Sequence, residues 1–138
     1  MCDAEKKAKQ RQLRLDQKSA VTSRISETSR LVGFGIVAWV FAIHTSQTSF
    51  AVSYVSSYKL WINIAGFGGM LTIVFDYLQY LCAYSSVNHS LTRSDQDYSY
   101  NKNHAGYVFQ NIFFVGKQVC AVAASLIVVV TFGLSVIL

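Results

Sequence analysis

Two charged residues lie inside stretches of the chain that are otherwise free of charge. Asp76 is the only charged residue within residues 60–84, and Lys117 is the only one within residues 107–138. A charge inside a lipid bilayer costs on the order of several kcal/mol unless it is paired or hydrated, so such residues are functional candidates. The sequence allows three interpretations: a structural ion pair, a conduction or proton-linked site, or two unrelated charges near the membrane surface, with Lys117 extending its amine to the headgroups.

The two charges are predicted to lie at a similar depth. Asp76 comes eight residues before the end of its uncharged stretch, and Lys117 comes ten residues after the start of its own. At the rise of an α-helix, these separations place them about 12 and 15 Å from the same membrane face. Thr72 and Gln79 fall on the helical face of Asp76, one turn to either side. We therefore expect these four residues to form an intramembrane ion pair with polar neighbours or to face a lumen.

No other group of residues suggests a catalytic or metal-binding site. His44 stands alone in an apolar stretch, where a single histidine is more often a hydrogen-bonded packing residue than a ligand. The remaining histidines, His89 and His104, lack metal-ligand spacing, and the three cysteines are scattered along the chain. There is no phosphate-binding loop and no nucleophile motif. We expect no enzymatic activity, no metal and no cofactor.

Three apolar segments are long enough to position these charges within a bilayer. They cover about 31–52, 60–84 and 107–138, and a helix needs roughly 20 apolar residues to span the hydrocarbon. Only 14% of the chain is charged, against about 25% in soluble domains. The prediction is an all-α integral membrane protein with three transmembrane helices in a small bundle. Residues 1–30 are then expected to form a basic cytoplasmic tail or a juxtamembrane helix, and the polar loop 85–106 is expected outside the lipid.

Small residues recur at helical spacing along one side of each apolar segment. Such residues let helix backbones approach closely in lipid, which offers no hydrophobic drive for association. They are Gly35, Ala38 and Ala42 in the first segment, Ala65 and Gly69 in the second, and Ala121 and Ala124 in the third. These stripes predict a seam within one bundle or an interface between copies. Because three short spans bury little surface, we expect a homo-oligomer.

The first 30 residues hold eight of the twelve Lys and Arg residues. These residues stop where the apolar segment begins, a pattern that favours contact with anionic lipid over nucleic acid. The side chains expected at the lipid surface are those of Lys6, Lys7, Lys9, Arg11, Arg14, Arg24 and Arg30. The positive-inside rule places this basic tail and the loop 85–106 in the cytoplasm. The chain is predicted to lie in the inner (plasma) membrane with its C-terminus outside.

Two functions from different classes fit this pattern. The first is a small oligomeric pore or membrane-perturbing effector, holin-like or part of an antiviral defence, in which a polar stripe faces a lumen. The second is a non-conducting anchor, immunity or accessory subunit that docks a cytoplasmic partner through its basic tail and polar loop. The polar stripes on all three segments favour the pore, because they exceed what an anchor needs.

Overall fold

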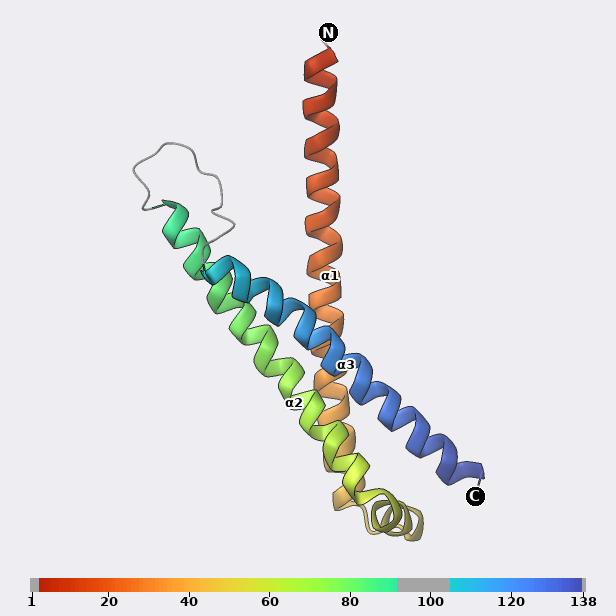
Figure 1. Ribbon diagram of the computed structural model, residues 1–138. Helices are drawn as coiled ribbons and strands as arrows, with labels where there is room; N and C mark the ends of the chain where they lie inside the picture. Colours follow the sequence, from red (N-terminus) through yellow and green to blue (C-terminus); the bar gives the residue numbers. More distant parts are fainter. Residues whose placement is uncertain (1–2, 92–104, 138) are drawn as a thin grey trace.

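The structure, a computed structural model, describes residues 3–91 and 105–137 and is entirely helical apart from residues 46–48. Helix α1 covers Asp3–Thr45, α2 covers Ser49–Leu91 and α3 covers Ala105–Ile137 (Figure 1). All three helices are long and apolar enough to cross a membrane. The start of α1, the end of α2 and the start of α3 lie toward one end of the molecule, and the α1–α2 turn and the end of α3 lie toward the other.

The first helix ends earlier than the sequence predicted, at Thr45 instead of residue 52. In the turn that follows, the Ser46 and Thr48 hydroxyls lie 3.1 Å apart. The Thr48 hydroxyl also accepts a hydrogen bond from the backbone N–H of Ala51 at 3.3 Å, and thereby caps α2. Ser and Thr side chains compete in this way with the helical backbone hydrogen bonds. The chain therefore turns here because uncharged polar side chains of the turn bind its backbone groups.

Helix α2 is longer than the predicted second span of 60–84, because the expected link before it is also helical. Backbone angles at Tyr58 (φ −120°, ψ 18°) kink the helix there. Tyr54, which precedes the kink, contacts α3: its hydroxyl lies 2.7 Å from that of Thr131. At the other end, residues 85–91 continue α2, and α3 begins at residue 105. Residues 92–104 of the predicted loop and Leu138 lie outside the described residues.

The three helices cross at a layer of small residues. Ile36 of α1, Ala65 of α2 and Ala124 of α3 form the buried cluster at the centre. On either side of the α1–α2 contact, a Cβ atom added to Gly33 would lie 3.0 Å from the carbonyl oxygen of Gly69, and one added to Gly69 would lie 3.0 Å from that of Gly33. These two positions accept glycine alone without a shift, since the backbones themselves are in contact.

The predicted packing face of the first span is wrong within this chain. Gly35, Ala38 and Ala42 are exposed, and a Cβ atom on Gly35 would meet nothing within 4 Å. The face that packs carries Gly33 and Ile36 instead. Two residues correspond to about 200° around a helix, so Gly33 and Gly35 point in nearly opposite directions. The small residues of the other two spans, Ala65, Gly69, Ala121 and Ala124, are buried between helices.

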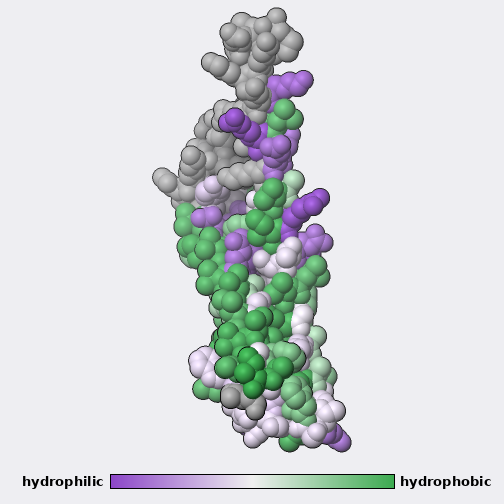
Figure 2. All heavy atoms as spheres, turned by 90° about the vertical axis from the view of Figure 1, so that its right-hand side faces the viewer, coloured by the Kyte–Doolittle hydropathy of each residue, from purple (hydrophilic) through white to green (hydrophobic). Residues whose placement is uncertain are grey.

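There is no structural boundary at residue 30, because the basic tail and the first span form one continuous helix. Its 43 residues correspond to a length of about 65 Å, roughly twice the hydrocarbon thickness of a bilayer. The N-terminal turns of α1 project past the ends of α2 and α3 (Figure 1). Hydrophilic residues gather on this projecting part, and hydrophobic residues cover the middle of the molecule (Figure 2).

A pair of glycine substitutions tests this helix crossing. Gly69→Ala should destabilise the fold by about 1–3 kcal/mol, because the added methyl group overpacks the contact with Gly33. The matched control Gly35→Ala adds the same methyl group on the open side of α1 and should cost nothing, since alanine is the better helix former by about 1 kcal/mol. Unfolding in detergent micelles, followed by circular dichroism, measures both. Equal effects would show that α1 and α2 do not meet at this face.

Candidate functional site

Asp76 and Lys117, the two charges inside the apolar stretches, form an ion pair. Lys117 Nζ of α3 lies 2.5 Å from Asp76 Oδ1 of α2. The residues are 3% and 0% exposed, respectively. A lysine that extended to the lipid headgroups would expose its amine, whereas this amine points inward to Asp76. The interpretations of the two residues as unrelated charges, and of Lys117 as a residue reaching the surface, are therefore wrong.

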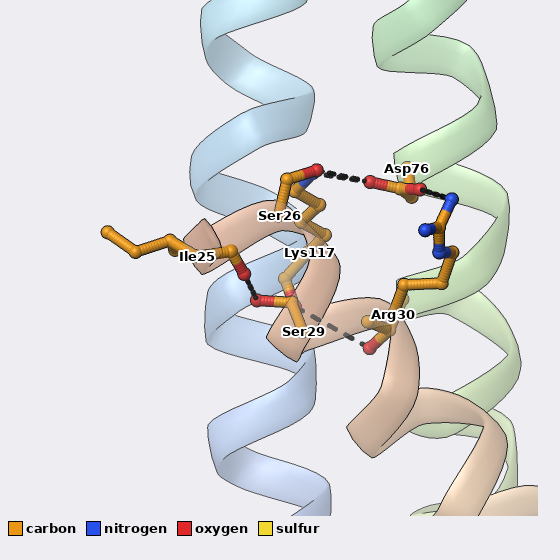
Figure 3. A network of polar contacts seen from close by, with 7 residues as sticks. Ile25, Ser26, Ser29, Arg30, Asp76 and Lys117 are labelled. Carbon is orange, nitrogen blue, oxygen red and sulfur yellow. Dashed lines mark hydrogen bonds and ion pairs between the residues drawn. The ribbon is translucent and has the colours of Figure 1, made fainter. Parts of the chain in front are cut away.

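Helix α1 contributes the third member of the site, Ser26, through its hydroxyl. Ser26 Oγ donates a hydrogen bond to Asp76 Oδ1 at 2.8 Å and accepts one from Lys117 Nζ at 2.5 Å (Figure 3). The residue is 5% exposed. A single hydroxyl can make both contacts because its oxygen accepts while its hydrogen is donated. The site thus holds one side chain from each of the three helices.

A second cation approaches the same carboxylate from the side facing away from Lys117. Arg30 Nη1 of α1 lies 3.9 Å from Asp76 Oδ2, and its side chain is 43% exposed. Arg30 lies one turn of α1 after Ser26, and its side chain reaches the carboxylate of Asp76 from the side opposite Ser26 (Figure 3). The predicted lipid contact Arg30 is therefore an ion-pair partner of Asp76, although a weak one at this distance and exposure.

The two predicted polar neighbours differ in how their hydrogen bonds are satisfied. Thr72 is fully buried and donates its hydroxyl hydrogen to the Gly68 carbonyl at 2.9 Å, four residues earlier in α2. Gln79 is also buried, but its Oε1 has no hydrogen-bond partner among the described residues. A buried amide oxygen of this kind is a site for an internal water molecule. Neither residue faces a lumen within this chain.

An aromatic ring also contacts the ion pair. The ring of Phe114 lies 5.4 Å from Lys117 Nζ, a cation–π contact from the same helix. No cluster of three His, Cys, Asp or Glu residues occurs in the described part of the chain. His44 is exposed, and its Nδ1 lies 2.9 Å from the Val40 carbonyl. The arrangement can fix helix positions, and it brings no nucleophile or ligand set together.

Sequence reasoning missed Ser26 because it assigned residues 1–30 to a tail outside the bundle. A signal was present: Ser26, Ser29, Gly33, Ile36 and Val40 follow one another at spacings of three and four residues. This pattern crosses the polar-to-apolar boundary and defines one face of a single helix. Ser26, Ser29, Gly33 and Ile36 on this face are buried. A search that ignored hydropathy and followed the spacing would have found the packing face of α1.

The other predicted lipid-contact residues lie in the N-terminal half of α1. The side chains of Lys9, Arg14 and Arg24 are exposed. Those of Lys6, Lys7 and Arg11 lie outside the described part of the structure. Contact of these residues with anionic lipid stays a prediction.

Removing the two charges should have unequal effects. Asp76→Asn leaves Lys117 buried without a carboxylate and should cost about 3–5 kcal/mol of stability. Lys117→Met should cost less, because Arg30 and Ser26 still contact the carboxylate. The double variant should recover much of the loss. Chemical denaturation in micelles gives all three values. Effects that add within about 0.5 kcal/mol would show that the two residues are not coupled.

Ser26 can be tested in the same way. Ser26→Ala removes a donor and an acceptor from a buried charged site and should cost about 1–3 kcal/mol. Ser23→Ala, one turn earlier on the exposed side of α1, is the control and should stay within about 0.5 kcal/mol of the unchanged protein. Equal stability of the two variants would place α1 away from the ion pair.

Comparison with protein-family models, with curated proteins and with solved structures finds no match for this chain. Its function is therefore inferred from its own residues. Their geometry is that of a buried, three-helix polar junction, formed by Ser26, Asp76 and Lys117, at the base of a long basic helix.

Proposed function

We propose that this chain is a non-conducting, non-catalytic membrane subunit that holds a basic helical arm, residues 3–24 of α1, in place for a partner to bind. The observation that carries this proposal is the burial of the polar residues that a pore would need at its lumen. Thr72 and Lys117 are 0% exposed and Asp76 is 3% exposed within a single chain. Asp76 and Lys117 pair with each other, and Thr72 donates to the Gly68 carbonyl. An oligomer could expose these side chains to a lumen only after the bundle opened.

The packing below the ion pair also favours a non-conducting role. On the side of Asp76 away from the arm, the three helices meet at Gly33, Gly69 and the cluster of Ile36, Ala65 and Ala124. Backbone and small side chains are in direct contact there. Thr72 also lies at this layer, 3.3 Å from a Cβ atom added to Gly33, but its hydroxyl already donates to the Gly68 carbonyl. An ion or a file of water molecules that reached Asp76 from the arm side would therefore meet mainly close backbone and apolar packing there.

The composition of α1 supports the docking role. Residues 1–30 contain eight Lys and Arg residues against four Asp and Glu residues, a net charge of +4. Leu13 and Val21 are exposed, and the larger apolar residues of the arm are too sparse in the sequence to form the wide apolar face with which a helix lies in a membrane surface. The arm is suited to an acidic protein surface, toward which its charge would steer association. By the positive-inside rule, this partner is cytoplasmic.

The proposal includes self-association of the chain but does not depend on it. The exposed face of α1 with Gly35, Ala38 and Ala42 offers the small residues that membrane helices use to pack against one another. A dimer through this face would present two arms on the same side of the membrane.

Ion flux measured in proteoliposomes tests the non-conducting role. Vesicles that contain the purified chain should release a trapped potassium or proton gradient no faster than vesicles without protein. A faster release would contradict the proposal if Asp76→Asn or Thr72→Val changed its rate and Gly35→Ala did not. The chain would then be a pore. A leak that none of these variants changes would come from the lipid, and it leaves the proposal standing.

Site-specific photocrosslinking in the cells that make the protein tests the arm. A photoreactive amino acid at Gln12, which is exposed on the arm, should give one discrete protein adduct. The adduct should disappear when Lys9 and Arg14 are changed to Glu. The same probe at Val130, exposed on the apolar face of α3, serves as the control and should give no such adduct. Adducts to lipid alone from Gln12 would contradict the docking role and favour the predicted lipid contact.

A further inference from the structure

A groove with a volume of about 560 Å³ runs between α1 and α3, the two helices that share the smallest interface. This volume lies within the roughly 300–1,000 Å³ of small-ligand sites. Most of its lining is apolar and comes equally from the two helices: Val21, Ile25 and Val32 from α1, and Val122, Leu126 and Val129 from α3. The groove is open along one side, where a membrane-embedded chain meets the acyl chains of its lipids.

Arg24 and Gln118 lie toward the arm end of the groove, and the hydroxyls of Thr28, Ser29 and Ser125 line it further along. Arg24 is the one charged residue in its lining, and no carboxylate is present there. Within the described residues, no acidic side chain pairs with Arg24, whereas Arg30, two turns further along α1, is held by Asp76. Gln118 of α3 also lines the groove, and its Nε2 is buried without a hydrogen-bond partner. The groove thus combines a free cation and an unsatisfied amide donor with a long apolar floor.

We propose that this groove binds one anionic glycerophospholipid. Its phosphate pairs with Arg24, and one acyl chain lies along the valines, Ile25 and Leu126 toward the middle of the membrane. Rotation of the Gln118 side chain about its last bonds turns the amide into the groove, where it donates to a phosphate or ester oxygen. The bound lipid therefore satisfies a buried donor that the chain leaves unpaired, as buried polar groups require.

The groove fits a lipid better than it fits a helix of a second copy. Helices that associate in membranes meet through small residues that let their backbones approach. Six of the twelve residues that line the groove are valine, isoleucine or leucine, and none is glycine. The exposed small residues of α1, Gly35, Ala38 and Ala42, are outside its lining. The change from one charged end to an apolar floor matches the change from headgroup to acyl chain.

Native mass spectrometry of the purified full chain tests the proposal. The protein is released from micelles that contain equal amounts of phosphatidylglycerol, which is anionic, and phosphatidylcholine, which is zwitterionic. One phosphatidylglycerol molecule should remain bound in preference to phosphatidylcholine. Arg24→Gln should lower this preference about fivefold, the contribution of one basic side chain near an anionic surface. Arg14→Gln removes the same charge from the exposed arm and should leave the preference unchanged.

The apolar part of the site is tested by filling it. Val122 lies in the groove and is 60% exposed, and Val130 is 56% exposed on the same helix outside the groove. Val122→Trp should abolish lipid retention, whereas Val130→Trp should leave it unchanged. Gln118→Leu should lower retention of both lipids, because it removes the amide donor that either headgroup region can use. All variants are compared at equal helical content, which excludes misfolded protein.

Three results would overturn the proposal. Equal retention of the two lipids by the unchanged protein would show an apolar surface without headgroup recognition. Equal effects of Arg14→Gln and Arg24→Gln would assign the preference to the general charge of the arm. A dimer mass that Val122→Trp removes would show that a second copy fills the groove. The measurement uses purified protein without a docking partner, so its failure leaves the proposed function of the arm untouched.

Discussion

The pairing of Asp76 with Lys117 in an apolar environment is the constraint on which the rest of this structure depends. Neither charge can be left alone among hydrocarbon side chains without a large cost, and each can be satisfied only by a group on another helix. The Ser26 hydroxyl completes the contact from α1. Because the atoms must meet within hydrogen-bond distance, the pair fixes how far each helix slides along its neighbours. Apolar packing alone would allow several positions of nearly equal energy.

The polar junction acts together with the layer of small residues beside it. At that layer, the carbonyl oxygens of Gly33 and Gly69 approach the opposite backbone so closely that neither position has room for a side chain. Close backbone packing holds the helices together in lipid, and the ion pair selects the one register in which the glycines face each other. The backbone packing holds the helices together, and the ion pair fixes their positions relative to one another. Two features that look unrelated in the sequence therefore maintain one geometry.

The sequence was informative where a residue stood out against its surroundings. Asp76 and Lys117 are conspicuous because uncharged segments enclose them, and three apolar segments of sufficient length predict three helices. The face of α1 could not be chosen from composition, because Gly33 and Gly35 both satisfy a small-residue pattern and only the position of Gly69 decides between them. The kink at Tyr58 could not be predicted, because no proline or glycine marks it in the sequence. Ser26 was missed because basic residues surround it, so the predicted bundle began at residue 31, five residues too late.

The unbroken course of α1 gives the molecule the mechanics of a lever. The helix is held at Gly33 by its contact with Gly69, which serves as the fulcrum. Asp3 lies about 45 Å from this point along the helix axis, and Ser26 lies about 10 Å from it on the same side. A tilt that moves the tip of the arm by about 4–5 Å therefore moves Ser26 by about 1 Å. That displacement is enough to break its 2.8 Å hydrogen bond to Asp76, so a pull on the tip of the arm reaches the charges buried between the three helices.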